Sequence, residues 1–311
     1  MPSLLTYLLE EKRSKRRGGL YHKTQVHLAY NSNRIEGSKL TEEQTRYIFE
    51  TRAIGLTDQD SVPVDDIIET SNHFTAFDYL LETATKPLAN TIIKEFHRLL
   101  KSATSDSAKP WFVVGGWKKL ANEVGGAETT PPGKVNAEML SLNRWYNSLS
   151  SSPSTSGRGA GGEGLPKANV TFEHIVEYHH RFETIHPFQD GNGRVGRLIL
   201  FRECLRNNIT PFIIDDTHKQ FYYRGLREFA ATPGYLLDTC RSAQDTYTSW
   251  INYFYPGAYS PLNNPKPANK RNNRTQLKKQ NQFRATRKTA LKTAMQTLSR
   301  FAPATNPPTP S

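Results

Sequence analysis

Apolar residues recur every three or four positions over most of residues 4–254, which is the spacing of helices with one buried face. In the segment 170–183, for example, Phe172, Ile175 and Val176 fall on one face. This spacing predicts helices over residues 4–17, 24–37, 41–56, 65–81, 90–100, 135–149, 170–183, 195–205, 220–231 and 236–254. The predicted fold class is therefore mainly α.

Two stretches interrupt the helical spacing. Over residues 113–132, the pairs Gly115-Gly116, Gly125-Gly126 and Pro131-Pro132 punctuate the sequence, which predicts a β-hairpin or an extended loop. Residues 150–164 are dominated by Ser and Gly, a composition typical of a flexible linker.

The net charge of +12 is concentrated at one end of the chain. Residues 263–311 contain six Lys and five Arg but no Asp or Glu, whereas the other 30 basic and 29 acidic residues nearly cancel. With few large apolar residues, the basic C-terminal tail over 255–311 is predicted to be disordered when isolated. Its charge suits nucleic acid or an acidic protein, and a purely solubilising tail is the simpler alternative.

A second basic run, residues 12–17, lies within the N-terminal segment 1–23, at the end of its predicted helix. It is either a solvated helix face or a contact for nuclear import or an acidic partner. Because no apolar run reaches about 18 residues, no contact with a membrane is expected. Cys204 and Cys240 are the only cysteines, which indicates buried thiols in a reducing compartment. We therefore expect a cytoplasmic protein, or a nuclear one in a eukaryote.

The densest chemistry lies in residues 186–197, His-Pro-Phe-Gln-Asp-Gly-Asn-Gly-Arg-Val-Gly-Arg. A Gly-rich loop that leads into a helix gathers free backbone N–H groups at the positive end of the helix dipole, which suits phosphate. Arg194 and Arg197 can each donate two hydrogen bonds to phosphate oxygens. Asp190 suits Mg²⁺, and His186 can accept a proton near neutral pH. Together these residues predict phosphoryl or nucleotidyl transfer.

A transition-metal site is the chief alternative for this cluster. His179 and His180 precede the loop, and with His186 and Asp190 they provide residue types that zinc prefers. However, adjacent residues on a helix point about 100° apart, so only one of the two histidines can easily face the loop.

The same stretch resembles the signature of the Fic (Fido) family, His-x-Phe-x-(Asp/Glu)-Gly-Asn-Gly-Arg-x-x-Arg, at every specified position. The resemblance implies a Fic-like helical bundle that transfers AMP from Mg·ATP to a Ser, Thr or Tyr hydroxyl of a target protein. It implies that His186 deprotonates this hydroxyl, that Asp190 holds Mg²⁺ and that Phe188 anchors the loop. The residues implied to bind ATP here are Gly191, Asn192, Gly193, Arg194 and Arg197, with Asn192 at the α-phosphate and the arginines at the β- and γ-phosphates. The implied catalytic set is His186, Asn192 and Arg194.

A second motif resembles the inhibitory helix of the family. Ser32, Glu36 and Gly37 match (Ser/Thr)-x-x-x-Glu-(Gly/Asn) ahead of the catalytic stretch, which implies the subclass with an N-terminal inhibitory helix, here residues 24–37. The implied mechanism is that Glu36 pairs with Arg197, so that ATP binds only in an unproductive pose. Two alternatives stay open: Glu36 is an exposed residue that caps a helix, or it orients a water that removes AMP from a modified target.

Two looser resemblances concern the target and the adenine base. Residues 113–132 resemble the flap of the family, with Val124 as an apolar clamp on the target side chain, and an ordinary surface hairpin is the alternative. Tyr222 and Tyr223 resemble an aromatic pair near the base of ATP, and core packing accounts for them equally well.

The Fic-like domain is predicted to span residues 24–254, with 150–164 as an insertion because the family fold continues across it. ATP and a hydroxyl-bearing target protein are the expected partners, and the sequence does not decide whether the chain also forms a homodimer. Two other functions stay open. One is a hydrolase that mainly removes AMP by means of Glu36, and the other is a nucleic-acid-associated binding protein with a dormant core.

Overall fold

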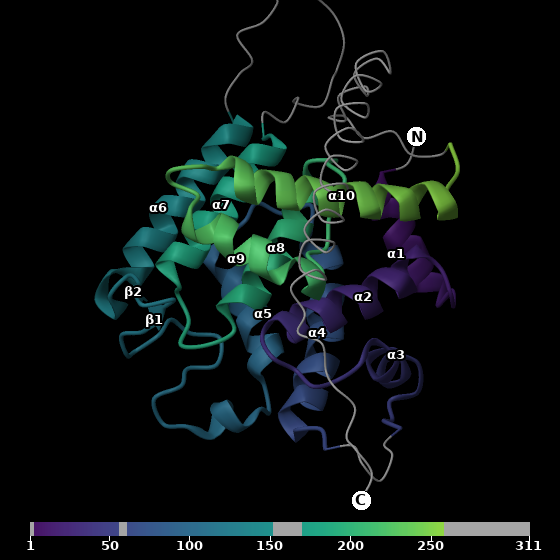
Figure 1. Cartoon of the computed structure of the whole chain (residues 1–311), viewed down its shortest axis with the longest axis horizontal. Coiled ribbons are helices and arrows are strands. Elements are labelled where there is room, and N and C mark those ends of the chain that lie inside the picture. The colour runs from purple at the N-terminus through teal and green to yellow at the C-terminus, as the bar shows by residue number, and fades with distance from the viewer. Residues whose placement is uncertain (1–2, 56–60, 152–169, 258–311) are drawn as a thin grey trace, which may run out of the picture. The chain divides into compact units, whose positions relative to one another are not determined.

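The computed structural model describes residues 3–55, 61–151 and 170–257, all within the unit Met1–Asn263 (Figure 1). They form helices and one small antiparallel hairpin, which confirms the predicted mainly α fold. The elements are α1 (Leu4–Ser14), α2 (Leu20–Ile35), α3 (Glu42–Thr51), α4 (Val64–Thr83), α5 (Asn90–Lys101), η1 (Ser105–Ala108), β1 (Glu123–Val124), β2 (Ala127–Glu128), α6 (Pro132–Ser151), α7 (Phe172–Ile185), α8 (Asn192–Arg206), η2 (Asp216–His218), α9 (Lys219–Arg227) and α10 (Gly234–Phe254). Most of the predicted insertion and of the basic tail lies outside the described residues. Across the described ranges, no helix combines the length and the apolar character that a membrane crossing needs.

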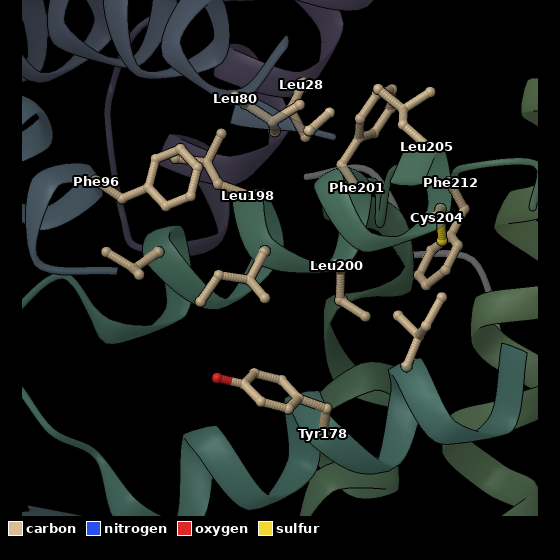
Figure 2. Packing of buried hydrophobic residues seen from close by; sticks show 14 of the residues in the cluster. Leu28, Leu80, Phe96, Tyr178, Leu198, Leu200, Phe201, Cys204, Leu205 and Phe212 are labelled. Atoms are coloured by element: carbon tan, nitrogen blue, oxygen red, sulfur yellow. The ribbon is translucent and has the colours of Figure 1, made fainter. Parts of the chain in front are cut away.

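Helix α8 lies in the hydrophobic core, where α2, α4, α5 and α7 pack against it. Figure 2 shows Leu198 and Phe201 of α8 among Leu80 of α4 and Phe96 of α5, with Tyr178 of α7 on another side. A helix that is covered in this way is apolar on more than one face. This burial fixes the direction of the first turn of α8, which carries the arginines of the predicted site.

The N-terminal segment contributes to the same core. Leu4, Leu5 and Leu8 of α1 are all buried in it. Helix α1 ends at Ser14, before the predicted boundary at residue 17, because Lys15 adopts a left-handed conformation with φ 52°. Helix α2 begins at Leu20 instead of at residue 24 and extends the predicted inhibitory helix toward the N-terminus.

Local signals explain two further helix ends. Thr41 forms a capping box at the start of α3, in which its hydroxyl accepts from the Gln44 N–H at 3.1 Å and the Gln44 side chain accepts from the Thr41 N–H at 3.0 Å. Helix α9 ends at Arg227, before the predicted boundary at residue 231. The residues that follow form turns, in which the Glu228 carbonyl accepts from the N–H groups of Ala231 at 3.1 Å and Thr232 at 2.8 Å.

The predicted hairpin lies within residues 113–132 but is shorter than that segment. Val124 pairs with Ala127 across a two-residue turn, Gly125-Gly126. Both glycines have positive φ, 59° and 80°, as tight hairpin turns of the favoured hand require. The rest of the segment is irregular and is held by contacts with the loop between α7 and α8.

Candidate active site

The loop between α7 and α8 turns through two left-handed residues. His186 ends α7 with φ 51°, and its N–H donates to the Phe182 carbonyl at 2.9 Å. Gly191, with φ 80°, precedes α8 and suits this position because a left-handed conformation costs other residues about 1–2 kcal/mol. Phe188 is fully buried, and its ring stacks on His97 with the two centroids 4.1 Å apart. This burial agrees with the anchoring role predicted for Phe188.

Asn192 holds the loop from inside. Its side-chain oxygen accepts from the Phe188 N–H at 2.8 Å, and its side-chain nitrogen donates to the Phe188 carbonyl at 2.9 Å. The side chain is almost completely buried. In this structure the amide of Asn192 therefore shapes the loop, and its contact with an α-phosphate stays a prediction.

His186 is half-buried, and its Nδ1 has no hydrogen-bond partner among the described residues. Burial, together with the nearby positive charge of Lys118, lowers the pKa of His186 to about 4. The imidazole is therefore uncharged at neutral pH and has a lone pair available. An uncharged imidazole beside an anion site is suited to act as a general base.

Asp190 and Arg194 belong to a network of charges that the sequence did not reveal. The buried ammonium of Lys101 donates to Asp190 Oδ2 at 2.7 Å, to Glu69 Oε1 at 2.7 Å and to Asp106 Oδ2 at 2.9 Å. The Arg194 guanidinium is also buried, and it pairs with Glu69 and with Asp190 Oδ2 at 3.2 Å. Partial burial raises the pKa of Asp190, but the charges of Arg194 and Lys101 outweigh it and lower this pKa to about 2.

These residues fit a magnesium ion that also binds phosphate. The Asp190 carboxylate is half-exposed and ionised, and Mg²⁺ commonly takes one or two carboxylates together with phosphate oxygens and water. In the part of the chain that the structure describes, no group of three or more His, Cys, Asp or Glu is arranged to hold a metal ion. His179 instead contacts the Tyr222 hydroxyl at 2.6 Å, and His180 stacks on Phe229. The alternative of a zinc site is therefore not supported.

Arg197 is held by the end of α2. Its Nε donates to Ser32 Oγ at 3.0 Å, and its Nη2 donates to the Ser32 carbonyl at 2.9 Å and to Glu36 Oε1 at 2.6 Å. Burial disfavours the charged form of Arg197, but the Glu36 carboxylate outweighs it, so that the pKa of Arg197 is raised. The structure thus brings the two predicted motifs together across 161 residues of sequence.

The two tyrosines predicted to lie near the base differ in exposure. Tyr222 is buried in the core, whereas the Tyr223 ring is 39% exposed. Of the pair, only Tyr223 presents an accessible ring, and core packing accounts for Tyr222.

The segment 117–129, which we call the hairpin segment, docks directly on the loop. The Lys118 N–H donates to the Pro187 carbonyl at 2.9 Å, and the Asn122 side chain donates to the Phe188 carbonyl at 3.1 Å. Val124 lies at the tip of the hairpin and is 48% exposed, so an apolar side chain is available beside the loop. Its role as a clamp on a target stays a prediction.

Two features define the class of this site: groups that favour phosphate and a histidine that can act as a general base. Backbone N–H groups at the start of α8 and two buried guanidiniums favour an anionic ligand, and an uncharged imidazole lies at the other end of the same loop. This arrangement suits the binding of a phosphate ester.

Residues 87–203 match the sequence profile described as the Fic/DOC family. Proteins named Protein adenylyltransferase Fic from Drosophila persimilis and Drosophila erecta are 30% and 28% identical over 205 residues. The matched region is 64% of this chain but only 35% and 36% of these relatives, so the chain spans about a third of the length of the curated relatives it matches.

Two solved structures have the same fold. A Fic domain containing signaling protein from Bacteroides thetaiotaomicron has a TM-score of 0.57 at 23% identity, over 80% of this chain and 90% of that chain. Fic-1 from C. elegans has a TM-score of 0.57 at 20% identity, over 80% of this chain and 70% of that chain. Residues 87–203 are thus similar in sequence to the Fic/DOC family, and the described residues share the fold of these two structures.

Proposed function

We propose that this protein transfers AMP from Mg·ATP to a Ser, Thr or Tyr hydroxyl of a target protein. The family, the relatives named protein adenylyltransferase and the complete signature over residues 186–197 support the proposal. The observation that carries it is the position of His186. Its uncharged imidazole stands at one end of a loop whose other end begins a helix with two buried arginines.

In the proposed reaction, His186 takes the proton of the target hydroxyl while the hydroxyl oxygen attacks the α-phosphorus of ATP. The bond from the α-phosphorus to the oxygen that bridges it to the β-phosphate breaks, and pyrophosphate leaves with that electron pair. Arg194 and Arg197 neutralise the charge of the leaving phosphates. Asp190 holds Mg²⁺, which when bound reduces the repulsion between phosphate oxygens.

We further propose that Glu36 inhibits the transfer. Arg197 cannot donate to a γ-phosphate through the N–H groups that already bind Ser32 and Glu36. The Glu36 carboxylate is one-third exposed, so it can leave Arg197 without unfolding the end of α2. Transfer then requires that Arg197 exchange this carboxylate for phosphate.

The test is incorporation of labelled AMP into lysate proteins, or into the chain itself, from Mg·ATP carrying a radioactive or heavy adenosine. Wild type, Glu36→Gly and the double variant Glu36→Gly/His186→Ala are compared, with Glu36→Gly/His27→Gln as a matched histidine control. We expect the label with Glu36→Gly and with its His27 control, and its loss when His186 is replaced. Equal labelling without His186 contradicts the proposed reaction.

AMP removal is the second candidate, because the partly exposed carboxylate of Glu36 lies against the first turn of α8, where a modified target would place its phosphate. A target that already carries labelled AMP distinguishes the two directions. Loss of label that requires Glu36 supports removal. Neither activity, together with salt-sensitive nucleic-acid binding that disappears on deletion of residues 263–311, supports a binding protein instead.

A further inference from the structure

Lys118 of the hairpin segment is a buried cation whose partners are neutral. The residue is 4% exposed, and its ammonium donates to Asn122 Oδ1 at 2.7 Å, to Thr129 Oγ1 at 2.6 Å and to the Ile185 carbonyl at 3.5 Å. No ion pair joins it to a carboxylate of the described residues. A buried charge without an opposite charge is costly, so a purely structural role would be filled more cheaply by a neutral side chain.

Lys118 contacts the chain on both sides of His186. Its backbone N–H donates to the carbonyl of Pro187, which follows the histidine, and its ammonium reaches the carbonyl of Ile185, which precedes it. The hairpin segment adds two contacts to the same loop, from the Asn122 side chain to the Phe188 carbonyl at 3.1 Å and from the Leu120 N–H to the Gln189 side chain at 3.1 Å. Lys118 therefore joins the hairpin segment to the backbone on both sides of His186.

The charges around His186 come from four parts of the fold. Lys118 of the hairpin segment is positive, whereas Asp190 of the loop and Glu36 of α2 are negative. Burial raises the pKa of the Glu183 carboxyl in α7 to about 8, so this side chain is largely neutral at pH 7. Among the described residues, Lys118 is thus the positive charge with the largest effect against protonation of the imidazole, and it acts against two carboxylates.

We propose that Lys118 is a positioning residue, whose buried ammonium fastens the hairpin segment to the loop and places a positive charge beside His186, the proposed general base. Its catalytic consequence rests on the proposed function. A lysine that only anchors the hairpin segment would leave the protonation of His186 unchanged on replacement by any side chain that preserves the fold.

The test is an NMR titration of the full chain with histidines labelled at Cε1, in which the resonance of His186 is assigned from a His186→Gln sample. Lys118→Met removes the charge, Lys118→Arg retains it in an altered shape, and Lys119→Met removes the charge of the exposed neighbour. We expect the midpoint of His186 to rise by roughly 0.5 pH unit or more in Lys118→Met, because a nearby positive charge has been removed. Lys118→Arg and Lys119→Met should keep the wild-type midpoint.

The rate of AMP transfer, measured as a function of pH in the Glu36→Gly background, should fall at low pH. The pH of this fall should be higher in Lys118→Met and unchanged in Lys118→Arg and Lys119→Met. An unchanged midpoint in Lys118→Met, or an equal rise in Lys118→Arg, overturns the proposal. If no variant transfers AMP at any pH, the proposed function fails while the titration still decides the role of Lys118. If Lys118→Met does not fold, Asn122→Asp is decisive. Its carboxylate neutralises the retained ammonium and should also raise the midpoint, and no rise there counts against the proposal.

Discussion

Replacement of Glu36 by Gln tests the ion pair with Arg197 at nearly constant shape. The Arg197 side chain is 3% exposed and the Glu36 side chain is 32% exposed, so the pair is only partly screened by water. At an effective dielectric constant of about 20, two unit charges 4 Å apart attract by about 4 kcal/mol. Desolvation and the exposure of Glu36 reduce this attraction, and couplings between protein sites commonly amount to about 1–3 kcal/mol, or about 5- to 150-fold.

We therefore expect Glu36→Gln to raise AMP transfer by about 5- to 150-fold and Glu36→Gly to raise it further. Gln retains a hydrogen-bond acceptor for Arg197 but no charge, whereas Gly retains neither. The assay is the initial rate of label incorporation from Mg·ATP at equal protein concentration. Glu43→Gln, at an exposed position of α3, is the matched control and should behave as wild type.

Melting temperatures with and without Mg·ATP distinguish the loss of an inhibitory contact from a general loss of stability. Both Glu36 variants should have a lower melting temperature than wild type without nucleotide, because Arg197 loses a partner in a buried site. The variants should gain more in melting temperature from Mg·ATP than wild type does, since Arg197 is then available to phosphate. If all three proteins transfer AMP at the same rate and gain equally from Mg·ATP, Glu36 does not control the site.

Three further predictions concern the loop, the metal and the buried histidines. Gly191→Ala should lower the free energy of unfolding in urea by about 1–2 kcal/mol, because its φ of 80° disfavours a side chain, whereas Gly133→Ala, in a helix with open space around it, should not lower it. Asp190→Asn should reduce the Mg²⁺-dependent part of the thermal stabilisation by ATP, and an undiminished effect of Mg²⁺ would argue against Asp190 as its ligand. Burial lowers the pKa of His73, His97 and His179 to about 3 each. The unfolded chain then binds more protons than the native one between about pH 3 and 6.5, so each histidine should reduce stability by up to about 1.4 kcal/mol per pH unit on acidification. The raised pKa of Glu183 has the opposite effect above about pH 4.5: there, acidification increases stability. This effect involves one proton, whereas the histidines together involve three. Constant stability between pH 6.5 and 4 would contradict the burial of these rings.

The sequence located the groups that lie close together along the chain. The residues from His186 to Arg197 form one continuous stretch, so their shared chemistry is visible without a structure. Glu36 lies far from Arg197 in sequence, and it was placed beside it only because its own motif resembles a known one. The capping box at Thr41 was also predictable, because both of its partners lie within one helical turn.

The residues that the sequence missed are isolated charges on different elements. Glu69, Lys101 and Lys118 stand in α4, in α5 and in the hairpin segment, and no local spacing distinguishes them from residues on a solvated face. Only tertiary packing brings Lys101 within 3.0 Å of three carboxylates and buries Lys118 beside the loop. The helix ends at Ser14 and Arg227 were missed because single-residue backbone conformations and short turns decide them.

Gly193 connects the loop with the proposed inhibition. A Cβ at this position would lie 2.9 Å from Arg197 Nη1 and still closer to Glu36 Oε1, so the absence of a side chain is what lets the carboxylate reach the first turn of α8. Backbone N–H groups at the start of a helix favour any anion in that place, whether carboxylate or phosphate. Under the proposed function, Glu36 thus inhibits by the same chemistry that binds ATP, because one anion occupies the guanidinium that another needs. An inhibitor of this kind need not distort the catalytic loop. The His186 backbone contact with Phe182 and the two contacts between Asn192 and Phe188 are accordingly formed while Glu36 is in place.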